Sequence, residues 1–324
     1  MLSRLNVIFR ETLKKWGSEL IEFNGEALEN DARMNISLID KIVAFAQVEE
    51  NIRAVILEGS FATHSQVDEL SDYDINIYAL DYEHYLSDDR WMSQIGDVLL
   101  YQKEHFQFYE TIIPTRLVLF RDRQRVDFSF WHLTLLSEMI RGEEHYESYS
   151  NGYQILVDKD HLAEQLKPPD GVGFLISLPG RDEFLQTIYD FWFEAYCVAK
   201  YLSRGDLWYA KLIENRYIKD HLFRMVLWNH QSANGWQSDH ILHREGKRFE
   251  QWAPSEFIDA ISQCFSRYDL DESWSSLFAM VDLFQWLARQ TSHRLQIEYP
   301  DRVEQEMINY LRYLKGLGNQ AMLS

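Results

Sequence analysis

The sequence predicts an α+β fold in two parts, a small mixed sheet with helices packed against it, followed by a helical bundle. Short apolar runs with the alternation of strands occupy the first half, whereas apolar residues in the second half recur every three or four positions. Between the halves, residues 167–180 hold three of the six prolines and three glycines, a composition typical of a linker. We therefore expect one domain over residues 1–165 and a helical domain over residues 166–324.

The first domain is expected to begin with a helical extension over residues 1–34. A helix over residues 38–46 follows, with Asn35 or Ser37 as its N-cap, because both side chains can accept a hydrogen bond from the first turn. Polar residues between the third and fourth strands suit a hairpin. The predicted strands are residues 53–57, 74–80, 116–120 and 125–131.

The second half is predicted to be helical throughout. A helix with apolar residues from Phe184 to Leu202 is ended by Gly205, and the same spacing continues from residue 208 to 228. A further helix is expected over residues 274–288 with Ser273 as its N-cap. Helices of this kind pack into a bundle.

Composition limits the class of protein. The chain has 324 residues, of which 46% are apolar, enough for large cores. No apolar run approaches the roughly 20 residues of a membrane span, and charged residues interrupt the N-terminal apolar stretches, so neither a membrane anchor nor a signal peptide is expected. The two cysteines, Cys197 and Cys264, lie in apolar helical patterns, which indicates reduced core residues in a cytoplasmic protein.

The net charge of −19 is concentrated in the first half. Acidic residues are dense between Glu49 and Asp89, a stretch in which Arg53 is the one base. Such a field attracts cations and repels a nucleic-acid backbone. We therefore expect a cationic small molecule as partner, no nucleic acid and no membrane, for a chain that acts as a monomer or homodimer.

The most informative motif is Gly59-Ser60, then eleven residues, then Asp72-Tyr73-Asp74. Side chains alternate along a strand, so Asp72 and Asp74 share a face and can hold a divalent cation. The Gly-Ser turn can offer N–H groups and a hydroxyl to phosphate oxygens. Surface acids beside a plain turn are the alternative interpretation, but strands on both sides make the combination specific.

Asp127 is the candidate for a third carboxylate. It shares one face of its strand with Ser129, while Val126 and Phe128 lie on the other face. A charge on such a strand is costly unless it has a partner. It could serve as a third metal ligand or as the base that takes a proton from an attacking hydroxyl. The alternative is a structural ion pair with one of three arginines, Arg116, Arg123 or Arg125.

These motifs resemble the nucleotidyltransferase superfamily that includes DNA polymerase β, and more narrowly the aminoglycoside 6-adenylyltransferases, which modify streptomycin. The resemblance covers roughly residues 35–315. It implies a nucleotidyltransferase domain before the bundle, ATP and Mg²⁺ as cofactors, and AMP transfer to an aminoglycoside, with the 6-hydroxyl of streptomycin as the expected acceptor and antibiotic resistance as the result. The segments that carry it are residues 52–60, 72–75, 125–129, 156–160, 183–202, 222–228 and 246–247.

The same resemblance singles out Lys200 and Lys247 as triphosphate contacts, since a lysine is a compact charge suited to phosphate. Without it, both would be interpreted as surface lysines. The chain also departs from the family pattern. Phe61 follows Gly59-Ser60 where the family has an arginine, and residues 99–114, expected to be loops on the acceptor side, match poorly.

Two other functions remain open from the sequence. A nucleotidyltransferase of this type could act on another small acceptor, such as a lincosamide. A non-catalytic nucleotide-binding or antitoxin-like protein could retain the same fold, although the three aspartates favour an enzyme.

Overall fold

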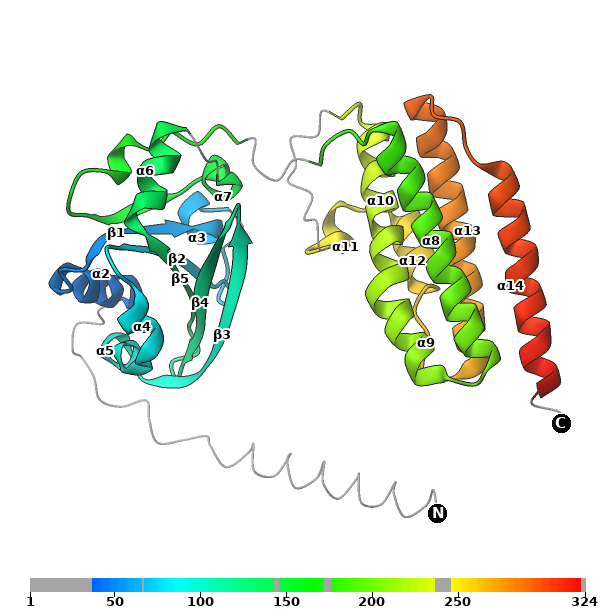
Figure 1. Cartoon of the computed structure of the whole chain (residues 1–324), viewed down its shortest axis with the longest axis horizontal. Coiled ribbons are helices and arrows are strands. Elements are labelled where there is room, and N and C mark those ends of the chain that lie inside the picture. The colour runs from blue at the N-terminus through cyan, green and yellow to red at the C-terminus, as the bar shows by residue number, and fades with distance from the viewer. Residues whose placement is uncertain (1–36, 66, 143–145, 172–175, 237–245, 322–324) are drawn as a thin grey trace, which may run out of the picture. The chain divides into compact units, whose positions relative to one another are not determined.

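A computed structural model shows the chain as two compact units (Figure 1). One unit comprises residues 1–143 and 154–166, and the other comprises residues 144–153 and 167–324. The domain boundary drawn from the sequence stays a prediction, and the extension expected over residues 1–34 lies outside the described residues. The structure describes residues 37–65, 67–142, 146–171, 176–236 and 246–321.

The first unit is built on a six-stranded mixed sheet with strand order β3-β4-β5-β2-β1-β6. Neighbouring strands are antiparallel except β2 and β5, which run parallel at the centre. The α+β class is therefore confirmed. The strands are β1 (Ile52–Glu58), β2 (Tyr73–Ala79), β3 (Val98–Phe108), β4 (Thr111–Phe120), β5 (Arg125–His132) and β6 (Gln154–Asp158).

The segment expected to form loops over residues 99–114 instead forms the β3–β4 hairpin, so that prediction is wrong. Pro114 argues against a strand at this position, because proline cannot donate a hydrogen bond to a neighbouring strand. Its position resolves the conflict: β4 pairs with β5 only from Thr115 to Leu119, and Pro114 lies beyond that pairing, opposite His105 of β3. The proline therefore occupies a part of β4 with a neighbour on one side.

Helices cover both faces of the sheet. One face carries Ile75, Phe128 and Phe130, which are buried in a core that includes residues of α2 and α5. The other face carries α6, where Tyr78 donates its hydroxyl to Sδ of Met139 at 3.8 Å. The helices of this unit are α2 (Leu38–Val48), α3 (Gly59–Thr63), α4 (Glu83–Ser87), η1 (Asp89–Trp91), α5 (Met92–Ile95), α6 (Leu133–Arg141) and η2 (Ala163–Gln165).

Ser37 is the N-cap of α2, one of the two residues predicted. Its hydroxyl accepts from the backbone N–H of Asp40, whose carboxylate accepts from the N–H of Ser37 in return. This reciprocal capping box satisfies two donors that the first turn would otherwise leave unpaired. The helix packs beside β1 and fixes one side of the sheet.

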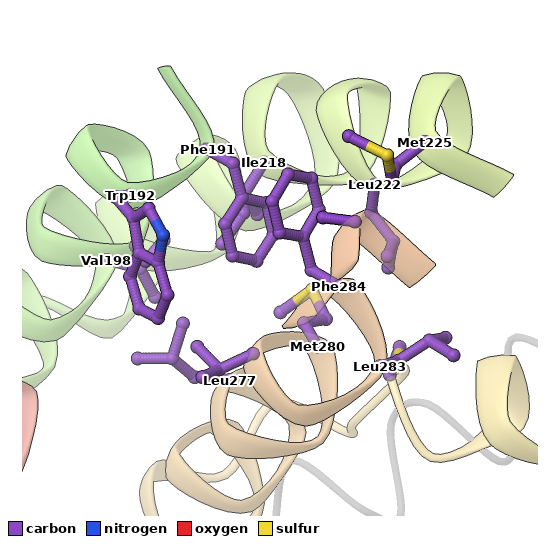
Figure 2. Close-up of a cluster of buried hydrophobic side chains, with 14 of the residues drawn as sticks. Phe191, Trp192, Val198, Ile218, Leu222, Met225, Leu277, Met280, Leu283 and Phe284 are labelled. Carbon is purple, nitrogen blue, oxygen red and sulfur yellow. The ribbon is translucent and has the colours of Figure 1, made fainter. Parts of the chain in front are cut away.

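The second unit is helical, as predicted, with α8, α10 and α13 lying alongside one another (Figure 1). Its core includes stacked rings of Phe191 and Phe284, with centroids 3.7 Å apart (Figure 2). The helices are α7 (Glu147–Asn151), α8 (Arg181–Ser203), α9 (Leu207–Ile213), α10 (Lys219–Ala233), α11 (Phe249–Trp252), α12 (Ser255–Ser262), α13 (Leu270–Leu295) and α14 (Asp301–Ala321), with a π-helical turn over Glu214–Ile218 between α9 and α10.

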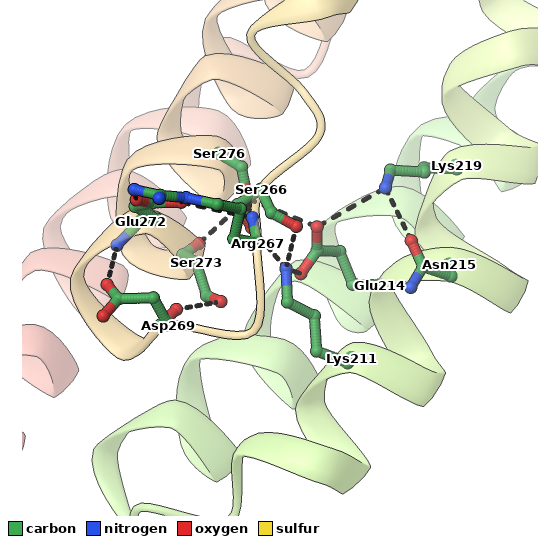
Figure 3. A network of polar contacts seen from close by, with 10 residues as sticks. All are labelled: Lys211, Glu214, Asn215, Lys219, Ser266, Arg267, Asp269, Glu272, Ser273 and Ser276. Atoms are coloured by element: carbon green, nitrogen blue, oxygen red, sulfur yellow. Dashed lines mark hydrogen bonds and ion pairs between the residues drawn. The ribbon is translucent and has the colours of Figure 1, made fainter. Parts of the chain in front are cut away.

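The N-cap predicted for the helix at residues 274–288 is wrong. The helix α13 begins at Leu270, and Asp269 is its cap, with a side chain that accepts from the N–H of Glu272 at 2.9 Å. Ser273 lies inside the first turn and donates its hydroxyl to the carbonyl of Asp269 (Figure 3). Both residue types favour caps, and only the course of the chain decides between them.

A polar network lies beside this helix start in the same unit (Figure 3). The fully buried Glu214 accepts from Lys211 at 3.0 Å and from Lys219 at 3.4 Å. Ser276 also contacts Glu214, at 3.3 Å. The pair of lysines balances a carboxylate that would otherwise be costly to bury.

Within the described ranges, no helix combines the length and apolar composition needed to cross a membrane.

Candidate active site

Asp72 and Asp74 lie where the chain returns into the sheet after the first strand. Strand β1 ends at Glu58, the short helix α3 follows, and β2 begins at Tyr73, so Asp72 directly precedes the strand. Asp74 is the register partner of Glu58 in the antiparallel β1–β2 pair. Both aspartates are half-buried. The strand alternation places them on one face, as the sequence predicts.

Asp127 is brought to the same place by the parallel pairing of β2 and β5. Its Cα is the register partner of the Cα of Asp74, and the next pair on this face is Asn76 with Ser129. The side chains of facing residues on neighbouring strands lie close together. The sheet thus joins residues that are more than fifty positions apart in the chain into one acidic site.

Asn76 contributes a buried amide to this face. It is 1% exposed and accepts from Nε1 of Trp131 at 2.7 Å through Oδ1. Its Nδ2 has no hydrogen-bond partner among the described residues. A buried donor without a partner is rare and costs free energy. This buried amide lies two residues beyond Asp74 on the same face of β2.

Gly59 allows the turn to approach the Asp74 carboxylate. Its φ is +72°, a conformation that L side chains rarely adopt, and it opens α3. A Cβ atom at this position would clash with Oδ2 of Asp74 and lie 3.2 Å from its Cγ. The Gly59-Ser60 turn and the acidic pair are therefore in direct proximity.

Phe61, at the position where the sequence departs from the family pattern, serves to pack the turn. Its ring stacks on that of Tyr73, with centroids 4.0 Å apart and planes 10° from parallel. Tyr73 lies between Asp72 and Asp74 but points to the opposite face of β2. The stacking packs α3 against the start of β2, between Asp72 and Asp74.

Arg125 is the cation of the site. Its Nε donates to Oδ1 of Asp127 at 2.8 Å, and its Nη2 donates to Oδ2 at 2.7 Å. Its Nη1 lies 3.2 Å from Oδ2 of Asp72. The ion pair expected as the alternative for Asp127 is therefore present with Arg125, while Arg116 pairs with Asp89. Sequence reasoning treated Arg125 only as an alternative, although its spacing of two from Asp127 already places both on one face.

Burial raises the pKa of Asp127, and the charges of Asp72 and Glu104 act in the same direction. The hydrogen bonds and charge of Arg125 lower the pKa, but the net direction is upward. Glu104, on the exposed strand β3, is therefore close enough to act on this carboxylate. A raised pKa improves the ability of Asp127 to accept a proton.

The residue types fit a hard divalent cation, because carboxylate oxygens are the ligands that Mg²⁺ prefers. The close approach of Asp74 to Gly59 and the register of Asp74 with Asp127 bring the donors together. In the described part of the chain, however, no three His, Cys, Asp or Glu side chains converge as a metal-binding group. The guanidinium of Arg125 instead contacts both Asp72 and Asp127.

The two lysines singled out by the resemblance lie in the helical unit. Lys200 on α8 lies over the rings of Tyr201 and Tyr196, with its Nζ 4.6 and 5.4 Å from their centroids. Lys247 is exposed in the turn before α11. They belong to a different unit from the acidic site, and their contact with a triphosphate stays a prediction.

Comparison with known proteins gives a consistent set of relatives. The family model described as "Streptomycin adenylyltransferase" matches residues 32–314. The aminoglycoside 6-adenylyltransferase of Bacillus subtilis (strain 168) is 27% identical over 275 residues, which covers 83% of this chain and 94% of the relative. That of Campylobacter jejuni is 24% identical over 283 residues, covering 86% and 95%. A crystal structure of an aminoglycoside 6-adenyltransferase from Bacillus subtilis matches with a TM-score of 0.41 and 21% identity, covering 87% of this chain and 99% of the other.

Proposed function

Because this chain belongs to the streptomycin adenylyltransferase family, whose model matches most of its length, we propose that it transfers AMP from ATP to a hydroxyl group of an aminoglycoside. The curated relatives carry the name aminoglycoside 6-adenylyltransferase. The 6-hydroxyl of streptomycin is the acceptor proposed for this chain. The observation that carries the proposal is the register of Asp74 with Asp127 beside the Gly59 turn.

In the proposed reaction, the acceptor oxygen forms a bond to the α-phosphorus of ATP. The bond between that phosphorus and the bridging oxygen breaks, and pyrophosphate leaves. Asp127 takes the proton of the attacking hydroxyl, a role supported by its raised pKa and by the lone pairs left on a carboxylate that accepts two hydrogen bonds. Most of the rate enhancement then comes from positioning and charge stabilisation.

Asp72 and Asp74 would hold the divalent cation, proposed to be Mg²⁺, and the Gly59-Ser60 turn would contact the triphosphate. The bound ion would neutralise charge on the phosphate oxygens. The sequence also suggested Asp127 as a metal ligand, but both of its oxygens accept from Arg125, which favours the role of base. Lys200 and Lys247 remain proposed triphosphate contacts from the helical unit.

The acidic surroundings support a cationic acceptor. Asp72, Asp127 and Glu104 lie on or near one face, and the chain as a whole carries a charge of −19. The guanidinium groups of streptomycin can form charge-assisted hydrogen bonds with carboxylates of this kind. Such a field also raises the local concentration of a cationic substrate.

The first test is to incubate the protein with ATP, Mg²⁺ and streptomycin and to measure the mass of the antibiotic. We expect a gain of one AMP unit with release of pyrophosphate. Asp127→Asn and Asp72→Asn should each reduce kcat/KM on the order of a thousandfold or more, because each removes a charge that acts in the transition state. Asp97→Asn is the matched control, since Asp97 pairs with Arg121 on the surface, and it should leave the rate unchanged.

The outcomes separate the remaining functions. Pyrophosphate release with another acceptor, such as a lincosamide, but not with streptomycin would keep the reaction and change the substrate. Binding of ATP without turnover on a panel of acceptors would support a non-catalytic nucleotide-binding protein. Full activity in Asp127→Asn would reject the role given to that carboxylate.

A further inference from the structure

The proposed active site contains a cation that belongs to the protein. Arg125 holds both oxygens of Asp127 in a two-pronged contact at 2.7 and 2.8 Å and reaches Oδ2 of Asp72 at 3.2 Å. The charge of Asp74 also acts on this guanidinium. All three proposed catalytic aspartates therefore interact with one arginine.

The strand fixes the arginine in this position. Arg125 is the first residue of β5, two positions before Asp127 on the same face. Its side chain is 42% exposed, compared with 36% for Asp72 and 22% for Asp127, so the contact is partly shielded from water. A planar guanidinium matches a carboxylate with two parallel hydrogen bonds, a geometry that an ammonium group cannot form.

The contact limits where a metal ion can bind. With Arg125 in place, both oxygens of Asp127 and one of Asp72 already face a positive charge. The position that we assign to the ion is formed by Asp74, which lies beside the Gly59 turn, and the other oxygen of Asp72. One or two carboxylates together with substrate phosphates are the usual ligands of a protein-bound Mg²⁺. A second ion between Asp72 and Asp127 would have to displace the guanidinium.

We propose that Arg125 is a resident cation that takes the place of a second divalent ion, so that the nucleotide complex of this enzyme holds one metal ion, at Asp72 and Asp74. The inference rests on the proposed function. In two-metal sites, a pair of ions about 4 Å apart stabilises the attacking and leaving oxygens. Here the guanidinium supplies fixed positive charge on the side of the proposed base, and the metal ion lies on the side of the Gly59 turn.

An ordinary surface ion pair is the alternative. Exposed pairs contribute little to stability and have no effect on the number of ions bound. The two interpretations therefore differ in metal stoichiometry, a quantity that does not depend on which aminoglycoside the enzyme uses.

The experiment counts Mn²⁺ ions bound to the complex with α,β-methylene-ATP, in the absence of any aminoglycoside. Free Mn²⁺ is measured by electron paramagnetic resonance after equilibrium dialysis. The wild-type chain should bind one Mn²⁺ per nucleotide complex and Arg125→Gln should bind two, because removal of the guanidinium opens the position between Asp72 and Asp127. Arg121→Gln, which changes an arginine paired on the surface with Asp97, should bind one.

Two ions, or none, in the wild-type complex would overturn the inference without any variant. One ion in Arg125→Gln, with unchanged affinity, would also overturn it, because the guanidinium would then not exclude a second ion. Arg125→Lys keeps the charge and should still bind one ion, which provides a check if the glutamine variant does not fold. Loss of AMP transfer to streptomycin with these counts unchanged would reject the proposed acceptor and leave the inference standing.

Discussion

At residue 59 the backbone of the first unit passes against the carboxylate of Asp74. Glycine meets two requirements there, a φ of +72° and the absence of a Cβ atom. The left-handed conformation costs a non-glycine residue roughly 1–2 kcal/mol. The second requirement concerns the site itself, because any side chain at residue 59 would displace the carboxylate of Asp74.

Gly59→Ala separates these two requirements when it is compared with Gly205→Ala. Gly205 has a similar φ of +75°, but nothing lies within 4 Å of its Cβ position. Both variants should lose about 1–2 kcal/mol of unfolding free energy from strain, measured by denaturant titration. Only Gly59→Ala should also reduce AMP transfer, by more than about tenfold. Equal activity in the two variants would show that the position of Asp74 beside the turn has no role in the reaction.

Side chains alternate along each strand, so the charged residues of the first unit are divided between the two faces of the sheet. Arg116 lies opposite Phe128 in the β4–β5 register, so it points into the apolar face and away from Asp127. There it is 4% exposed and donates its Nε to Asp89 at 2.9 Å. Asp89 also accepts from Lys103 at 2.6 Å and from Tyr101 at 3.0 Å. This cluster ties η1 to the β3–β4 hairpin.

Asp89→Ala should destabilise the first unit by about 3 kcal/mol, because it leaves the buried charge of Arg116 without its carboxylate. Burial raises the pKa of Asp89, but hydrogen bonds from Lys103, Arg116 and Tyr101 outweigh it and the net pKa lies below 3.8. The stabilisation is therefore complete above the ordinary pKa and is lost as the pH falls through the lowered value.

Unfolding free energies of wild type and Asp89→Ala, measured across this pH range, should therefore converge at low pH. Asp97→Ala, which removes an exposed pair with Arg121, should change stability by less than about 0.5 kcal/mol at any pH. A pH-independent difference for Asp89→Ala would mean that lost packing, and not the ion pair, explains the effect.

Most of the helices and the central strands could be predicted from the sequence. Spacing indicated the central strands and long helices because burial on one face imposes a period of two or about 3.6. The failures have local causes. Pro114 concealed the β3–β4 hairpin, and at the start of α13 two good cap residues, Asp269 and Ser273, lie four positions apart.

For the molecule as a whole, one hydrophobic core lies in each unit. Cys197 and Cys264 both lie in the helical unit, as does the buried Glu214 network. Burial raises the pKa of the Cys264 thiol to about 12, and it raises the pKa of Cys197 as well. Because the thiolate is the reactive form, both thiols should react slowly while this unit is folded.

Thiol modification at pH near 8 can therefore report on the helical unit alone. Glu214→Ala should speed the reaction of both cysteines, since it leaves Lys211 and Lys219 without their buried partner and costs about 3 kcal/mol. Asp89→Ala should lower the stability of the first unit and leave the thiol reaction rate unchanged. Similar acceleration in both variants would show that the units unfold together.

The sequence alone determined which side chains share a face, because alternation along a strand is a local property of the backbone. It thereby indicated Asp72 with Asp74, Asp127 with Ser129, and the acidic character of the first half. Only the tertiary structure decided that β5 lies parallel to β2 with Asp127 beside Asp74, and that Arg125 rather than Arg116 or Arg123 pairs with Asp127. Strand order and register depend on contacts between distant segments, and these are set by the packing of the whole sheet rather than by any local pattern.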